Sequence, residues 1–237
     1  MILALLLALP AQAAEQALVY DLSVEGAAVG TREVTIKYLS RPSGERHVLE
    51  SFTHIEAAGM VLESRGSGLS TPTTAQFSSI TERSGTRSAV AAQELPEGGW
   101  QVTVTSGGKQ TERGEPNVRL STLDLMDPGR VGLLAGAGTF GLVIAETGDV
   151  VTGTLGEGEP TTVKVGGQAV EVTRYALTGG NGTARFFVDA DGLLVRSEVL
   201  WLGMTMIGSL RDLPPARDYG VVETIEGLSG GVKEGDL

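Results

Sequence analysis

Apolar and polar residues alternate along most of this chain with the period of two that marks β-strands. In the first such segment, Leu18, Tyr20 and Leu22 fall on one face, whereas Asp21 and Ser23 fall on the other. The same alternation predicts further strands over 31–38, 46–55, 60–67, 73–82, 88–94 and 100–105. Because short turns join the neighbours, this part of the chain is predicted to form an up-and-down meander.

The alternation stops near Asn117. Residues 121–126 begin like a helix cap, and Asp127 followed by Pro128 suits an N-cap with proline in the first helical position. We therefore expect one or two short helices over 117–137, covering an open end of the sheet. Strands are predicted to return over 142–144, 150–154, 161–165, 169–178, 183–188, 193–202 and 204–210.

These elements predict an all-β, mainly antiparallel protein: a curved meander sheet or half-barrel with one or two short inserted helices. The predicted domain covers 14–213 and ends near Pro214 and Pro215. Residues 214–237 are acidic and rich in glycine, which is typical of a tail of low order. The 34 glycines of the chain fit the many turns that such a sheet needs.

Residues 1–13 resemble a secretory signal peptide. An apolar run (ILALLLAL) is followed by Pro10 and by the small-x-small pattern Ala11-Gln12-Ala13. The run is about half of the ~20 residues that a membrane-spanning helix needs, so we expect no transmembrane span. We therefore expect export and a periplasmic or secreted location.

Charge and composition narrow the function classes. The net charge of −11 repels phosphate backbones, so we expect no nucleic-acid partner. The chain has no cysteine, which excludes thiol catalysis, zinc–thiolate sites and iron–sulfur clusters. The two histidines, His47 and His54, lie at an odd separation on one predicted strand and therefore on opposite faces.

Two motifs have simple structural explanations. The glycines at 136, 138 and 141 fit G-x-G-x-x-G, but the segment after them is too short for the helix that a dinucleotide site requires. Asp189-Ala190-Asp191-Gly192 lacks the third ligand position of a calcium loop and suits a hairpin turn. We expect no cofactor, no metal and no catalytic residues.

The remaining candidate site is hydrophobic. Trp201, Met204 and Met206 lie close together in the last predicted strands, and Tyr20 lies on the apolar face of the first. Methionine and tryptophan on the concave face of a sheet can hold a lipid-like ligand. More often, apolar residues on one face simply form part of the core.

Several segments carry a family resemblance. Tyr20-Asp21-Leu22 followed by Gly26 and Val29-Gly30, together with 121–128 and 187–196, resembles exported bacterial β domains of unknown function. Such domains stand alone in the periplasm or precede transglutaminase-like domains, and their fold is similar to the half-barrels of the lipoprotein-carrier superfamily. The resemblance implies a curved antiparallel sheet with inserted helices and a hydrophobic groove. Transglutaminase chemistry needs a cysteine, which this chain lacks.

The sequence thus favours an exported, non-enzymatic protein that binds an apolar ligand or an envelope component in a half-barrel. The alternative is a structural or interaction module of an envelope complex, which acts through sheet edges. A cavity lined by Tyr20, Trp201 and Met204 would favour the ligand carrier. A filled interior with exposed edge strands would favour the interaction module, and acidic residues clustered with His47 in a cleft would favour an enzyme.

Overall fold

The protein is described here by a computed structural model that covers residues 14–215 except 42–43, 58, 180–182 and 202. The predicted signal peptide, most of the predicted tail and the expected turn at Asn181-Gly182 lie outside the described residues.

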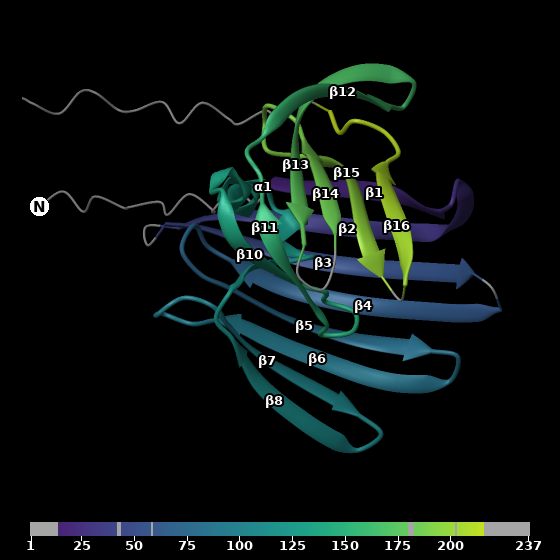
Figure 1. Cartoon of the computed structure of the whole chain (residues 1–237), viewed down its shortest axis with the longest axis vertical. Coiled ribbons are helices and arrows are strands. Elements are labelled where there is room, and N and C mark those ends of the chain that lie inside the picture. The colour runs from purple at the N-terminus through teal and green to yellow at the C-terminus, as the bar shows by residue number, and fades with distance from the viewer. Residues whose placement is uncertain (1–13, 42–43, 58, 180–182, 202, 216–237) are drawn as a thin grey trace, which may run out of the picture.

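The first half of the chain forms a meander of long antiparallel strands in which each strand pairs with its successor (Figure 1). Its strands are β1 (Ala14–Val24), β2 (Ala27–Arg41), β3 (Gly44–Ala57), β4 (Met60–Ser70), β5 (Ala75–Arg83), β6 (Thr86–Glu94), β7 (Trp100–Ser106) and β8 (Lys109–Glu115). The predicted up-and-down meander is therefore confirmed.

The second half crosses the first. A short strand, three short helical turns and seven further strands follow β8. They are β9 (Val118–Ser121), η1 (Asp124–Met126), α1 (Pro128–Val131), η2 (Gly132–Ala135), β10 (Gly138–Val143), β11 (Val150–Leu155), β12 (Glu159–Val165), β13 (Gln168–Thr178), β14 (Ala184–Val188), β15 (Leu194–Trp201) and β16 (Met204–Leu210). Figure 1 shows β13–β16 lying across the long strands of the meander.

One sheet of 16 strands contains both halves. Strand β1 joins them because it pairs with β2 on one side and with β16 on the other, with Tyr20 opposite Leu210 in the second pair. All described pairs are antiparallel except β9 with β10. The sheet curls into a nearly closed, barrel-like form (Figure 1). The all-β prediction is confirmed, and the curvature goes further than a half-barrel.

Alternating side chains of the curled sheet form its interior. In β3, His47, Leu49, Thr53 and Ile55 are buried, and the residues between them are more exposed, as the alternation predicts. One apolar cluster fills the space between the meander and β13–β16. A second cluster, around Trp100 and Phe77, lies where β9 and β10 meet β5–β7.

The structure differs from the predicted elements between 109 and 121. Residues 109–115 form strand β8, whose charged sequence carries no apolar alternation. Residues 118–121, which were expected to be helical, form β9 because they pair with β10. The helix start at Asp127 and Pro128 is confirmed, since the Asp127 side chain accepts a hydrogen bond from the Gly129 backbone N–H.

Within the described residues, the helical segments are all too short or too polar to cross a membrane.

Candidate functional site

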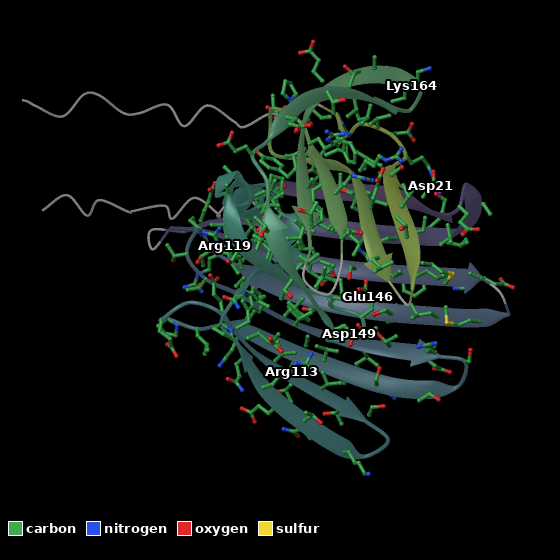
Figure 2. The ribbon with its side chains drawn as sticks, viewed as in Figure 1. Asp21, Arg113, Arg119, Glu146, Asp149 and Lys164 are labelled. Carbon is green, nitrogen blue, oxygen red and sulfur yellow. The ribbon has the colours of Figure 1, made fainter. Side chains whose placement is uncertain are left out.

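A tight turn between β10 and β11 reaches into the barrel. The Ile144 backbone N–H donates to the Asp149 carbonyl at 2.8 Å, and the Gly148 N–H donates to the Ile144 carbonyl at 2.7 Å. Figure 2 labels Glu146 and Asp149 on this turn, which overlies β4 and β5. The sequence pattern gave no sign that this connection would enter the interior.

Strand β5 anchors the backbone of this turn. The Ser79 hydroxyl donates to the Ala145 carbonyl, and the Thr81 hydroxyl donates to the Glu146 carbonyl at 2.8 Å. Ser79 and Thr81 are inward-facing and buried, so their hydroxyls require such partners. The turn is therefore a fixed part of the barrel interior rather than a loose surface loop.

Gly148 allows this turn to pack closely. Its φ of +74° lies in the left-handed region, and a Cβ at this position would lie 2.5 Å from Cγ2 of Val104. Glycine adopts this left-handed backbone at low cost, and it has no Cβ to clash with Val104. The position of the turn against β7 thus depends on the absence of a side chain here.

The tip of the turn carries a buried ion pair. The Glu146 carboxylate contacts the Arg32 guanidinium, and the two side chains are only 7% and 13% exposed. The Arg32 Nε donates to the Thr53 hydroxyl at 3.0 Å, which fixes the orientation of the guanidinium. Removing one partner of such a pair is strongly destabilising, because it leaves the other charge buried and unpaired.

Beside this ion pair lies a small apolar cavity. Strands β1–β3 and β15–β16, helical turn η1 and the inserted turn enclose it. Its lining residues are Leu22, Arg32, Ile55, Thr122, Leu125, Met126, Ile144, Glu146, Ser197, Val199, Met206 and Gly208. About 50 Å³ is open to the centre of a water-sized sphere. The cavity therefore accommodates an alkyl chain end or a few waters, but not a whole diacyl lipid.

A wider and more polar mouth lies on the other side of Glu146. It offers about 600 Å³ by the same measure and lies between the ends of β4–β7 and the inserted turn. Its lining residues are Gly59, Met60, Leu62, Thr81, Arg83, Ser84, Thr86, Ser88, Val104, Ser106, Glu146 and Thr147. Among the described residues, Glu146 is the one that lines both the apolar cavity and the mouth.

Of the four ligand-binding candidates from the sequence, Met206 lines the cavity. Met204 is half-buried but does not line it. Trp201 ends β15 and pairs with Met204, and its side chain lies outside the described residues.

Tyr20 belongs to the core instead. It is 1% exposed, and its hydroxyl donates to the Leu194 carbonyl at 2.8 Å. Burial raises the pKa of Tyr20. The face of Tyr20 was predicted correctly, but Leu22, one alternation further, is the β1 residue that reaches the cavity.

A second polar cluster lies where α1 meets the rim of the meander. His47 Nδ1 lies 2.7 Å from Oδ1 of Asp127, and the Ser70 hydroxyl donates to Oδ2 of the same carboxylate. Asp127 is fully buried. Burial favours a raised pKa for Asp127, but the hydrogen bonds from His47, Ser70 and Gly129 outweigh it, and the pKa is lowered.

Serine, histidine and aspartate thus meet, but not in the order that nucleophilic catalysis requires. A catalytic serine donates to the histidine, whereas the Ser70 hydroxyl donates to Asp127. None of these three residues lines the apolar cavity or its mouth. The arrangement is that of a structural clamp, in which one carboxylate ties β3, β4 and α1 together.

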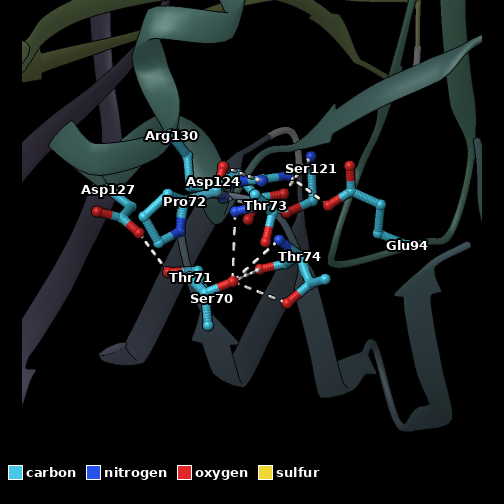
Figure 3. A network of polar contacts seen from close by, with 10 residues as sticks. All are labelled: Ser70, Thr71, Pro72, Thr73, Thr74, Glu94, Ser121, Asp124, Asp127 and Arg130. Atoms are coloured by element: carbon cyan, nitrogen blue, oxygen red, sulfur yellow. Dashed lines mark hydrogen bonds and ion pairs between the residues drawn. The ribbon is translucent and has the colours of Figure 1, made fainter. Parts of the chain in front are cut away.

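Neighbouring residues extend this clamp (Figure 3). Arg130 Nη2 donates to Glu94 at 2.6 Å, and Asp124 accepts hydrogen bonds from the backbone and hydroxyl of Ser121. Burial raises the pKa of Asp124 to about 6, although the Ser121 hydrogen bonds and the Arg130 charge act against it. The helical turns are therefore held by polar contacts at one end of the barrel.

The two sequence motifs have structural roles here. Gly138 and Gly141 lie in β10, and the next element is β11 rather than a helix. Asp189 forms the hairpin turn by accepting from the backbone N–H groups of Asp191 and Leu193. Among the described residues, His, Asp and Glu form no group of three that could hold a metal ion.

The fold places this chain among all-β, barrel-like domains. No family model and no curated protein matches the chain. A crystal structure of a β-barrel-like protein of the domain of unknown function DUF1849, from Brucella abortus, is similar to it. The match has a TM-score of 0.50 and 13% sequence identity, and it covers 83% of this chain and 95% of the other. At this identity the likeness supports the fold and carries no functional assignment.

Sequence reasoning missed Arg32 and Glu146. They are 114 positions apart, and each stands in an unremarkable local pattern. One signal was present: Arg32 is a charged residue at an inward position of β2, in phase with Val34 and Ile36, where the alternation calls for an apolar side chain.

Proposed function

We propose that this protein is a non-enzymatic binding protein whose barrel interior takes an apolar ligand. The observation that carries the proposal is the apolar cavity between β1–β3 and β15–β16, with Met206 and Val199 in its wall. Methionine adapts its shape to irregular ligands, and apolar concave sites are the usual places for small molecules.

The volume of the cavity limits how large a part of the ligand it can hold. The space next to Met206 takes an alkyl chain end, while the mouth beyond Glu146 has room for a larger polar portion. A single-chain molecule fits this shape better than a diacyl lipid. We therefore propose a lipid-like ligand that inserts a single alkyl chain into the cavity.

The experiment is a titration of the full chain with octanol, followed by heteronuclear NMR. Octanol is expected to shift the methyl resonances of Val199 and Met206, and Val199→Phe is expected to weaken this binding at least about tenfold by filling the cavity. Thr205→Phe is the matched control, since Thr205 is exposed on the opposite face of β16. Equal binding to both variants, or no binding to the wild type, would refute the proposal.

We also propose that the protein works outside the cytoplasm. Residues 1–13 carry the signal-peptide pattern, and cleavage after Ala13 would leave β1 intact because β1 begins at Ala14. N-terminal sequencing of the protein from its own cells is expected to start near Ala14 or Glu15. Recovery of a cytoplasmic protein that retains Met1 would contradict this.

An interaction module that works through sheet edges is the second candidate. Strand β8 pairs only with β7 among the described residues, and most of its residues are exposed. Its sequence, KQTERGE, is highly charged, and charged edge strands resist pairing with other chains. The edge thus favours this function less than the cavity favours ligand binding.

A further inference from the structure

We propose that Arg32 is the head-group site of this cavity. In this proposal, the anionic group of a single-chain amphiphile, a carboxylate or a phosphate monoester, replaces the Glu146 carboxylate on the Arg32 guanidinium. The alkyl chain then occupies the apolar cavity. The inference rests on the proposed function, because it adds a charged end to the ligand.

Arg32 is suited to this task by its position. Among the residues that line the cavity, Arg32 is the only cation and Glu146 the only anion. The guanidinium is oriented by Thr53 through Nε and contacts Glu146 through Nη2. Its Nη1 makes no hydrogen bond within the described residues. A planar guanidinium with a fixed orientation is the preferred partner of carboxylate and phosphate groups.

The position of the inserted turn does not depend on the Glu146 side chain. The hydrogen bonds that anchor the inserted turn come from its backbone: Ser79 and Thr81 donate to the carbonyls of Ala145 and Glu146. Among the described residues, the Glu146 side chain makes one polar contact, the one with Arg32. In this proposal, the Glu146 side chain rotates away from Arg32 toward the mouth, which Glu146 also lines.

The mouth offers the displaced carboxylate a suitable environment. It is lined by the hydroxyl residues Thr81, Ser84 and Ser88 and by Arg83. Among the described residues, Arg83 pairs with no carboxylate, and its Nε donates to the Met60 sulfur. A polar, open space with a nearby cation lowers the cost of moving Glu146 out of the interior.

Charge balance favours replacement of the Glu146 carboxylate by the ligand anion over binding of the anion beside the intact ion pair. A second anion beside the intact pair would add an unpaired negative charge to a buried site, which is costly. Replacement keeps one anion on Arg32 throughout. A neutral ligand leaves the ion pair as it is, so the inference predicts that anionic ligands compete with Glu146 and neutral ligands do not.

The test compares octanoate, octyl phosphate and octanol by calorimetry on the full chain. The wild type is expected to bind at least one of the two anions more tightly than octanol. Glu146→Gln removes the competing carboxylate and is expected to bind that anion about tenfold more tightly, whereas Arg32→Met is expected to lower its affinity to that of octanol. Arg174→Gln is the matched control, because Arg174 forms an exposed pair with Glu159 and lines neither the cavity nor its mouth.

The outcomes separate the two proposals. Binding of octanol with no preference for either anion in the wild type and in Glu146→Gln overturns the head-group site and leaves the proposed function standing. Failure of all three ligands overturns the proposed function as well. A preference for octyl phosphate or for octanoate supports the site and identifies its head group.

A second measurement avoids dependence on variants that fail to fold. In the wild type, the preferred anion is expected to shift the Arg32 Nε–H resonance, and octanol is expected to leave it unchanged. An Arg32 resonance that responds equally to the anion and to octanol overturns the inference.

Discussion

His47 Nδ1 lies 2.7 Å from Oδ1 of Asp127, and this contact joins two segments that are 80 positions apart. His47 belongs to β3 in the long meander, whereas Asp127 is the N-cap of α1. The same carboxylate accepts hydrogen bonds from Ser70 and from the Gly129 backbone. Asp127 is therefore one of the residues through which the short helices are attached to the sheet.

Asp127→Ala is expected to destabilise the protein by about 3 kcal/mol, because it removes the N-cap and leaves the buried partners of the carboxylate unsatisfied. The midpoint of urea unfolding measures this loss. Asp191→Ala is the control, since Asp191 is exposed in the hairpin turn. A loss no greater than that of the control would show that the clamp adds nothing to stability.

Asp124→Asn is expected to change how stability depends on pH. Burial raises the pKa of Asp124 to about 6, so the folded state holds this proton more tightly than the unfolded state does. Its contribution to stability is therefore fully present below about pH 4 and is lost as the pH rises to about 6, a change on the order of 3 kcal/mol. Asparagine keeps an acceptor for Ser121 and cannot ionise, so the fall between these pH values should shrink. An unchanged profile in chemical unfolding would count against the raised pKa.

Tyr20→Phe is expected to cost about 1–2 kcal/mol of unfolding free energy, because the buried Leu194 carbonyl loses its donor. Octanol binding should stay unchanged, because Tyr20 does not line the cavity. Tyr175→Phe provides the comparison, since no described residue is hydrogen-bonded to the Tyr175 hydroxyl. A Tyr20→Phe variant that keeps its stability but loses octanol binding would show that Tyr20 belongs to the ligand site.

Gly148→Ala is expected to lower stability by about 2 kcal/mol, since alanine would combine a φ of +74° with a contact of 2.5 Å to Val104. The resulting displacement of the turn should also shift the NMR resonances of Glu146 and Arg32. Gly26→Ala is the control, because Gly26 has a similar φ and open space around its Cα. Equal losses in the two variants would mean that backbone conformation alone accounts for the effect.

The sequence predicts much of the sheet because local alternation follows from burial of one strand face. Residues within a few positions of one another predict which faces of β1 and β3 are buried. They also predict the helix N-cap at Asp127. Strand β8 was missed because its charged edge sequence has no apolar face to alternate. Strand β9 was missed because its conformation depends on pairing with β10, across the helical turns.

The candidate site was less predictable for a related reason. Alternation places Met206 on the inner face, but whether an inner residue meets a cavity or a packed core depends on the opposite wall. That wall includes the turn bearing Glu146, which belongs to a connection with no periodic pattern. The pairing of Arg32 with Glu146 and of His47 with Asp127 likewise depends on how distant strands curl toward each other.

The pairing of β1 with β16 has a consequence for the order of folding. Tyr20 and Leu210 face each other in this pair, and Arg211 extends it with hydrogen bonds to Asp21. During synthesis, β1 and its hairpin partner emerge first, and the outer edge of β1 waits for the last strand of the domain. Contacts between such distant segments are slow to form. Residues Tyr20–Val24 of β1 therefore stay open on one edge until β16 has been synthesised, and in that interval another polypeptide can pair with them.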